Sequence, residues 1–584
     1  MGCLFGAILA LMVFSDPVRG ETGTVLRMAE DLRAGRISEE QALLYTAYAV
    51  FDPGRVPERY REERTIKCGT PTIEEVRSKW YLLGASAREE LAVYFSRRPK
   101  QYSYVSPSGH YRIHYDLSGG DAVDPSDEDL DGVPDYAEVV AATFDSVWSL
   151  EVDRLGYSPP LGDDGAGGGE EYDIYVLDLS PQRVYGYTIP EGPGRQARWA
   201  SFIQVDNDYT DRVYGITRGV DAVRVTAAHE FFHAIQYSYY SEGLSWWMEA
   251  TATWMEDVAY DEVNDYYQYL DTFFNRPADP LDQFTGSYDV YANGACVFEH
   301  YLTERPSGTP DVIHQIWERV RTRQSGALSV FDQVIPGGLR KAMEEFARWN
   351  YFTGPRARPE FYRDGANYPD VATQTIQLDA AAKAVGSGGV GRLACDYLRI
   401  RPGGMQGGVR LYLEGGGDAT WAMQVLLLRP DAYDVQSLSD TLTIPMWDRY
   451  DEIVLIPTVT SWTGTGDSYS YSVRFDPSLT DSLVVFASRL MPPRPHPFRP
   501  HLGARVYFPF ELARYTERAE LAIFTKEGEL VRRIEHGPLP AHEHAEIFAW
   551  DGMNERGYTV GSGLYFYRID ADGFSGTGKV AVTR

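Results

Sequence analysis

The chain has few cysteines and few bases for its length. Only four cysteines occur in 584 residues, and Cys3 lies in an N-terminal apolar segment. If that segment is removed, Cys68, Cys296 and Cys395 remain, so at least one thiol is unpaired or joins another chain. Lys and Arg total 55 against 84 Asp and Glu, a formal net charge of −29. This surplus of acids argues against nucleic acid or an anionic membrane as a partner.

Long apolar runs are also scarce. Residues Cys3 to Phe14 are apolar without interruption and are followed by the polar stretch from Ser15 to Gly20. The run is too short for a stable membrane span and resembles a secretory signal peptide, although no Lys or Arg precedes it. The alternative is an N-terminal core helix. We predict a signal peptide over residues 1–20 and a secreted product, extracellular or at the cell surface, with no membrane span.

One segment, from Thr226 to Gln236, contains the arrangement H-E-x-x-H. On a helix, a spacing of four residues puts His229 and His233 on one face, where both imidazoles can bind one tetrahedral zinc ion. Glu230 then lies beside the metal and can take a proton from a zinc-bound water. The alternative is a buried amphipathic helix that carries two histidines by chance.

A second apolar helix is predicted from Trp246 to Asp257. Its acids Glu249 and Glu256 are seven residues apart and therefore share a face. Because a buried carboxylate needs a partner, we assign Glu249 as the third zinc ligand, and Glu256 or Asp257 as the group that orients a ligand histidine. The reverse assignment, with Glu256 as the ligand, stays open.

These residues resemble the gluzincin metallopeptidases, in which a ligand Glu follows in an E-[GA]-x-A setting that Glu249 to Ala252 matches. Tyr288 to Ala295 resembles the Y-x-x-G-A stretch of aminopeptidase-like gluzincins, which implies that Tyr291 hydrogen-bonds the tetrahedral oxyanion. A packing tyrosine is the alternative. Residues 60–370 as a whole look like a little-characterised family of secreted bacterial metalloproteases of the myxobacterial type.

Residues 21–104 are predicted to form a helical pro-region, with capping-box patterns at Ser38 to Gln41 and Thr72 to Glu75. Within it, the run from Lys67 to Pro71 resembles the cysteine switch of matrix metalloprotease zymogens. The resemblance implies that the Cys68 thiolate occupies the open zinc position of a latent enzyme. A disulfide or a plain buried thiol are the alternatives for Cys68.

A calcium loop is predicted from Asp127 to Glu138, because oxygen ligands recur in the register of an EF-hand loop with Gly132 at its sixth position. No matching helix precedes it, so we expect a structural calcium outside a true EF-hand pair. A solvated acidic turn is the alternative. The predicted ligands are Asp127, Asp129, Asp131, the carbonyl of Val133, Asp135 and Glu138.

The predicted fold class is α+β multidomain. A zincin-like metallopeptidase domain over residues 105–375 has its substrate-pairing edge strand at Ser201 to Asp206. Short strands with Gly-rich turns predict a β-sandwich over 376–482. Residues 483–584, including Leu521 to Gly528 and Trp550 to Asn554, resemble the FlgD-type immunoglobulin-like domain. That resemblance implies attachment to secretion or cell-surface machinery.

The sequence therefore predicts a secreted zinc endopeptidase that hydrolyses peptide bonds of a protein or peptide substrate, with Zn²⁺ and a structural Ca²⁺ as cofactors. The alternative is a non-catalytic surface-binding or adhesive protein on a zincin scaffold. The combination of His229, His233 and Glu249 with the base Glu230 favours the enzyme. An exopeptidase is less favoured because the sequence shows no amine-binding cluster of acids.

Overall fold

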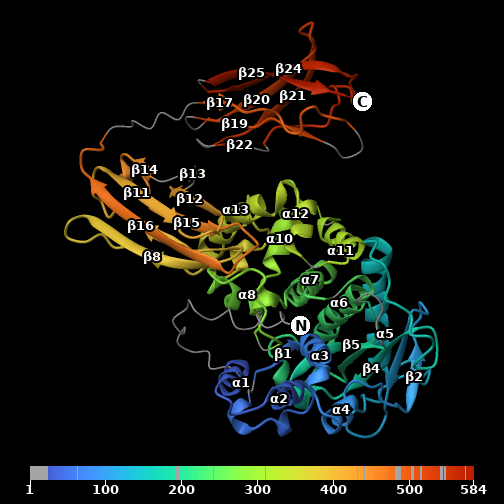
Figure 1. The fold of residues 1–584 in the computed structure, drawn as a ribbon. Coiled ribbons are helices and arrows are strands. Elements are labelled where there is room, and N and C mark those ends of the chain that lie inside the picture. The colour runs from blue at the N-terminus through green and yellow to red at the C-terminus, as the bar shows by residue number, and fades with distance from the viewer. Residues whose placement is uncertain are drawn as a thin grey trace, which may run out of the picture. The chain divides into compact units, whose positions relative to one another are not determined.

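The chain forms two compact units, Met1–Ala372 and Thr373–Arg584, each with its own sheets (Figure 1). The structure is a computed structural model that describes residues 24–584 except 62–63, 193–197, 241, 288, 310, 326, 431, 439–440, 481–487, 501–504, 513–515, 540–542, 545–546, 573 and 584. The predicted signal peptide, residues 1–20, and Tyr288 lie outside the described residues. The architecture is mixed α and β and multidomain.

The first unit contains one six-stranded sheet in the order β1-β5-β6-β4-β3-β2. Strands β3, β4 and β6 run parallel, whereas β5 is antiparallel to β6 and β2 is antiparallel to β3. The short strand β1 pairs with β5 in parallel, with Cys68 opposite Gly186. The bounds are β1 Ile66–Cys68, β2 Tyr102–Val105, β3 Tyr111–Tyr115, β4 Tyr172–Leu177, β5 Val184–Glu191 and β6 Ala200–Asp206.

The prediction that Ser201 to Asp206 forms the edge strand of the sheet is wrong. It corresponds to β6, which lies inside the sheet between β5 and β4. The reason is the hairpin from β5 to β6, which places β5 outside β6 and presents the outer side of β5 to β1. The segment that brings Cys68 to the sheet therefore occupies the position that a paired peptide would take on β5.

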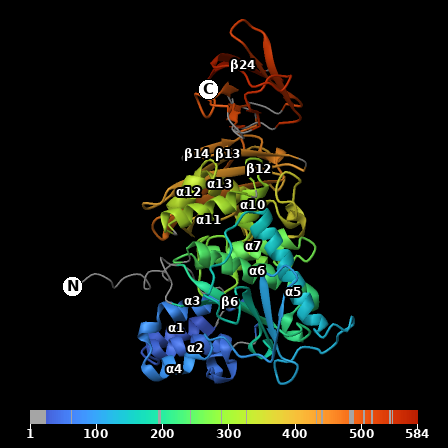
Figure 2. The same cartoon turned by 90° about the vertical axis from the view of Figure 1, so that its right-hand side faces the viewer.

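The N-terminal helices share a hydrophobic core with this sheet. Leu43 and Val50 of α2 pack in one cluster with Tyr187 and Ile189 of β5 and Phe202 of β6. Figures 1 and 2 both show these blue helices grouped beside the sheet. The side chain of Ser38 caps α2 in a capping box. The helices are α1 Thr24–Arg33, α2 Glu39–Phe51, α3 Thr70–Ser78 and α4 Ala85–Ala92.

Helices α6 (Gly219–Tyr239) and α7 (Ser245–Ala259) pack against each other, and α6 also packs on β5 and β6 (Figures 1 and 2). Almost every residue of α6 from Ala222 onward is buried. The polar side chains of α6 from Thr226 onward, which include His229, Glu230 and His233, are in the protein interior, where each needs a partner.

The remaining helices of the unit surround this pair. Helix α5 packs on α6 and β3, α10 packs on α7, and α11 packs on α6. Their bounds are α5 Asp135–Trp148, α8 Tyr267–Phe274, α9 Tyr291–Gly294, α10 Val297–Glu304, α11 Asp311–Arg323, α12 Leu328–Val334 and α13 Gly338–Tyr351.

The second unit begins with two sheets around one core. The sheet orders are β13-β12-β15-β10-β7, with β9 on β15, and β14-β11-β16-β8. Leu455 and Val409 come from opposite sheets and belong to the same buried cluster. The bounds are β7 Gln374–Thr375, β8 Lys383–Gly391, β9 Ala394–Cys395, β10 Leu398–Ile400, β11 Gly408–Gly415, β12 Trp421–Leu428, β13 Tyr433–Ser437, β14 Thr441–Ile444, β15 Glu452–Val459 and β16 Gly466–Asp476.

The last part of the chain has a separate core that includes Phe508, Trp550 and Ile569. Its sheets follow the orders β17-β19-β22, β18-β23 and β21-β20-β24-β25. The bounds are β17 Arg489–Leu490, β18 Val506–Tyr507, β19 Phe510–Glu511, β20 Ala519–Phe524, β21 Leu530–His536, β22 Glu543–His544, β23 Ala549–Trp550, β24 Gly563–Ala571 and β25 Phe574–Val582.

Two further findings concern the whole described chain. None of the helices in the described ranges combines the length and the hydropathy that a bilayer crossing requires. Cys68, Cys296 and Cys395 are each a buried free thiol, so no disulfide joins any two of them.

Candidate metal centre

Helix α6 directs two imidazole nitrogens at each other. The Nε2 atoms of His229 and His233 are 3.1 Å apart. The Nδ1 atom of His229 lies 2.7 Å from Glu256 Oε1, and that of His233 lies 2.7 Å from Gln236 Oε1. Both Nδ1 atoms face oxygen acceptors, which suits the tautomer with the proton on Nδ1 and the lone pair of Nε2 turned inward. Two inward lone pairs at this separation suit a shared cation.

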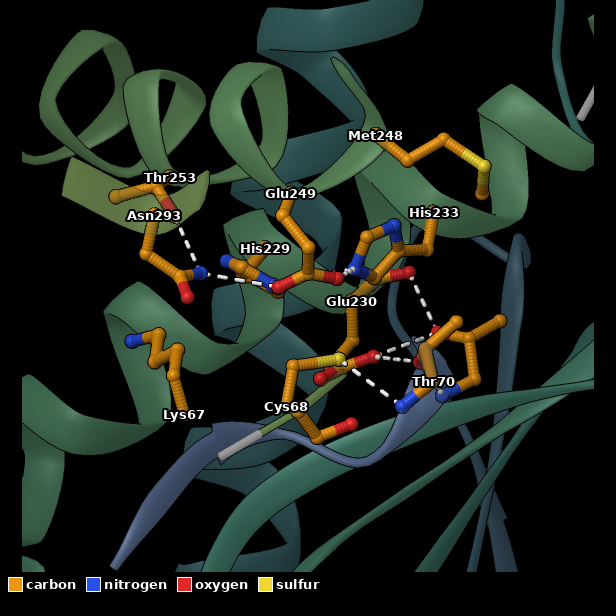
Figure 3. A network of polar contacts seen from close by, with 12 residues as sticks. Lys67, Cys68, Thr70, His229, Glu230, His233, Met248, Glu249, Thr253 and Asn293 are labelled. Carbon is orange, nitrogen blue, oxygen red and sulfur yellow. Dashed lines mark hydrogen bonds and ion pairs between the residues drawn. The ribbon is translucent and has the colours of Figure 1, made fainter. Parts of the chain in front are cut away.

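Helix α7 adds a carboxylate to this pair. Glu249 Oε1 is 3.1 Å from His233 Nε2, and Glu249 Oε2 is 3.6 Å from His229 Nε2. Figure 3 shows the Glu249 carboxylate between the two imidazoles. Although burial acts to raise it, the neighbouring histidines hold the pKa of Glu249 well below its usual range. Glu249 therefore brings a negative charge to the point where the two Nε2 atoms meet.

Cys68 completes a group of four. The ligand-capable atoms of Cys68, His229, His233 and Glu249 all lie within 4.8 Å of one another, and all four residues are buried. Bonds of about 2.0–2.3 Å to zinc would place tetrahedral ligands roughly 3.3–3.8 Å apart, so small side-chain adjustments suffice. The donor set of two imidazoles, one carboxylate and one thiol is of the kind that zinc accepts. The group therefore fits the metal.

Without a bound cation, the Cys68 side chain is a neutral, unreactive thiol. Burial, and after it the charges of Glu230 and Glu249, raise its pKa well above the usual value. Its sulfur accepts a hydrogen bond from the backbone N–H of Thr70 at 3.3 Å (Figure 3). A thiol with a raised pKa releases its proton when its sulfur binds a metal and otherwise stays neutral.

Glu230 lies beside the group without joining it. Its Oε2 accepts hydrogen bonds from the hydroxyls of Thr188 at 2.8 Å and Thr70 at 3.2 Å. Its Oε1 is buried and has no hydrogen-bond partner among the described residues. One oxygen is thus fixed in orientation while the other remains able to accept a proton.

Glycine is required where β5 passes this helix. A Cβ at Gly186 would lie 2.8 Å from Thr226 Cγ2 and 3.1 Å from Glu230 Cγ. These distances are shorter than ordinary van der Waals contacts, so only glycine lets the strand come this close to α6. The close approach brings Thr188 of β5 to Glu230.

The two predicted orienting acids have different neighbours. Glu256 faces His229, whereas the Asp257 carboxylate lies 3.2 Å from Arg363 Nη2 and 4.0 Å from His300 Nδ1. Glu256 is therefore the residue that fixes the ring of a histidine in the group. It stays outside the four-residue group itself, and Glu249 lies within it.

Tyr291 is close in sequence to the site but has other contacts. Its hydroxyl donates to the carbonyl of Asp279 at 3.1 Å, and the Arg276 guanidinium lies over its ring at 4.8 Å. The same helical turn contributes Asn293, which the sequence analysis did not single out. Asn293 Nδ2 donates to Glu249 Oε2 at 2.9 Å and to Thr253 Oγ1 at 3.1 Å, and so orients the carboxylate.

The predicted calcium loop brings three carboxylates together. Ligand oxygens of Asp127, Asp129 and Asp131 lie within 4.8 Å of one another. Positive φ angles at Leu130 and Gly132 fold the loop, and the N–H of Gly132 donates to Asp127 at 2.9 Å. Of the other predicted ligands, the carboxylates of Asp135 and Glu138 lie outside this group of three. Asp135 accepts the N–H of Glu128 at 2.9 Å, Glu138 lies in the first turn of α5, and Val133 donates its N–H to Asp131.

Residues 501–573 match the FlgD Ig-like domain family, so the C-terminal core belongs to an FlgD Ig-like domain. The structure of FlgD from P. aeruginosa is 19% identical over 14% of this chain and 64% of that one, with a TM-score of 0.12. PorZ, an essential bacterial surface component of the type-IX secretion system of Porphyromonas gingivalis, is 18% identical over 19% of this chain and 14% of that one, with a TM-score of 0.13.

A third similar structure is PliG of Salmonella Typhimurium, a periplasmic inhibitor of g-type lysozyme. It is 13% identical over 18% of this chain and 99% of that one, with a TM-score of 0.15. Scores this low carry no argument about the whole chain. The comparison with curated proteins gave no match. The resemblance to gluzincins and to the myxobacterial metalloproteases therefore stays a prediction.

Proposed function

We propose that the first unit is a secreted zinc-dependent peptidase of zincin type, held latent by Cys68. The main support for the proposal is the buried group of His229, His233, Glu249 and Cys68. Beside it lies Oε1 of Glu230, which accepts no hydrogen bond from the described residues. A binding scaffold has no chemical need for a carboxylate held in this way.

Zinc, when bound, supplies a Lewis acid that polarises a carbonyl and lowers the pKa of a bound water. The residues of the chain have separate roles. His229, His233 and Glu249 hold the metal, while Glu256 and Asn293 orient two of these ligands.

Glu230 serves as the general base. Thr188 and Thr70 fix its Oε2, so that Oε1 is presented to take the proton from the attacking water and deliver it to the leaving amine. Removing this carboxylate should abolish turnover without removing any metal ligand.

In this proposal, Cys68 keeps the enzyme latent. Its sulfur lies where a fourth ligand would bind, and strand β1 carries it along β5. A thiolate in that position would exclude the attacking water, so activity would require that β1 be displaced. The FlgD Ig-like domain, in this proposal, attaches the enzyme to secretion or cell-surface machinery.

Zinc content and casein hydrolysis test the proposal. We would compare the full chain with Glu230→Gln, each before and after limited proteolysis of the N-terminal region. One zinc per chain and hydrolysis that depends on Glu230 and rises after proteolysis would support a latent peptidase. One zinc without hydrolysis in any form would favour the non-catalytic scaffold, and no zinc would refute the ligand assignment.

A further inference from the structure

Lys67 is a buried lysine next to the metal centre. Only 3% of its surface is exposed, and its Nζ lies 2.9 Å from Glu256 Oε2 and 2.9 Å from Asp265 Oδ2. The ring of Tyr185 faces the ammonium at 5.1 Å. Two carboxylates and an aromatic ring thus surround one buried cation, and removing the cation would leave buried charge uncompensated.

Asp265 is held in its negative form in this pocket. Asp265 accepts hydrogen bonds from the Tyr269 hydroxyl at 3.0 Å and from Gln268 Nε2 at 2.6 Å. Although burial acts to raise it, the Lys67 ammonium holds the pKa of Asp265 below its usual range. The three groups that face the ammonium come from β5, from α7 and from the segment just before α8.

The cation comes from another part of the chain. Lys67 belongs to β1, the same strand that carries Cys68 to the metal group. Backbone hydrogen bonds from Ile66 to Arg183 and from Gly69 to Gly186 hold this strand on β5. Displacement of β1 would therefore open the fourth metal position, the outer side of β5 and the cation pocket together.

After β1 is displaced, the pocket would hold a buried carboxylate without its counter-charge. This is unfavourable until another cation enters. A peptide that adds to β5 as a strand would place one side chain in the position of Lys67. Its neighbour would lie at the position of Cys68, beside the metal. The net charge of −29 attracts basic peptides over longer distances.

We propose that Asp265, Glu256 and Tyr185 form a substrate subsite for a lysine or arginine side chain. The substrates are peptides with a basic residue next to the bond that is cleaved. This inference rests on the proposed peptidase function, and it makes Asp265 the main determinant of that preference, because Glu256 is also engaged by His229.

The test uses the zinc-loaded full chain, activated by limited proteolysis, and peptides that differ at one position: Lys, Arg, norleucine or Glu. We expect kcat/KM for Lys to exceed that for norleucine by about tenfold or more, as for a desolvated charge pair. Asp265→Asn should bring this ratio close to one. Asp271→Asn, which removes an exposed charge from the adjacent helix α8, is the matched control and should keep the ratio.

Each outcome decides between the two proposals. Cleavage of the Lys and norleucine peptides at equal rates, or a ratio that survives in Asp265→Asn, would overturn the subsite and leave the peptidase intact. No cleavage of any peptide in any form would overturn the peptidase, and the substrate subsite with it.

A second measurement does not need turnover. In the full chain, Lys67→Ala should lower Tm, and n-butylammonium should restore part of the loss in a saturable way, whereas tetramethylammonium at equal ionic strength should not. The rescue should vanish in the double variant that carries both Lys67→Ala and Asp265→Asn. As a control, Lys79→Ala removes a partly exposed lysine and should show no such response. If Lys67→Ala does not fold, Lys67→Met keeps the side-chain length. Absence of rescue in a folded variant would refute an accessible cation pocket.

Discussion

The Nδ1 atom of His229 lies 2.7 Å from Oε1 of Glu256, on the next helix of the chain. The other carboxylate oxygen of Glu256 binds the ammonium of Lys67 at 2.9 Å. One carboxylate therefore connects a histidine of the candidate metal centre to the cation of the N-terminal strand. The orientation of the His229 ring and the docking of β1 depend on the same group.

Replacing Glu256 by Gln should weaken zinc binding by about 10- to 100-fold, because the amide orients the imidazole without a negative charge behind it. Competition with a chromophoric chelator measures the affinity. Asp257→Asn is the matched control, since Asp257 faces Arg363 and His300 instead of His229. Equal affinities in the two variants would contradict the orienting role of Glu256.

Cobalt substitution should reveal Cys68 directly. The full chain loaded with Co²⁺ is expected to show a thiolate-to-cobalt charge-transfer band in the near ultraviolet, because the Cys68 sulfur lies within the donor group. Cys68→Ala should remove the band. Cys296→Ala removes another buried thiol and should leave it unchanged. A band that persists in Cys68→Ala would exclude this thiol as a ligand.

Calcium should raise the thermal stability of the chain. If Asp127, Asp129 and Asp131 hold a calcium ion, a concentration of 100 Kd stabilises the folded state by about 2.7 kcal/mol. Scanning calorimetry with calcium or with EGTA measures the shift in Tm. Asp131→Asn should reduce the shift, whereas Asp153→Asn, an exposed acid beyond the loop, should not. The same Tm in calcium and in EGTA would favour a solvated acidic turn.

Gly186→Ala should destabilise the first unit by about 1–3 kcal/mol, because the added methyl group overlaps Thr226 and the backbone of Gln204. Urea unfolding measures the change in free energy. Gly162→Ala is the control, since its Cβ would meet no atom within 4 Å. An unchanged midpoint in Gly186→Ala would mean that β5 can move away from α6 without cost.

The sequence by itself determined the local part of the candidate site. The four-residue spacing of His229 and His233 is a property of any α-helix, so their shared face follows from helical geometry alone. The predicted calcium loop is equally local, because its spacing is a property of the sequence, and three of its carboxylates lie close together. The C-terminal segments, such as Leu521 to Gly528, resemble the FlgD Ig-like domain closely enough to predict it, and that prediction is confirmed.

Tertiary structure alone decided what surrounds the two histidines. Lys67 and Asp265 are 198 residues apart in the chain, and Asn293 is 44 residues from Glu249. No local pattern pairs such residues, because their contact depends on where whole helices and strands pack. The misplaced edge strand has the same origin, since the strand order depends on a hairpin reversal that alternation within one strand cannot reveal. Local periodicity specified the elements, and long-range packing specified which side chains share one buried site.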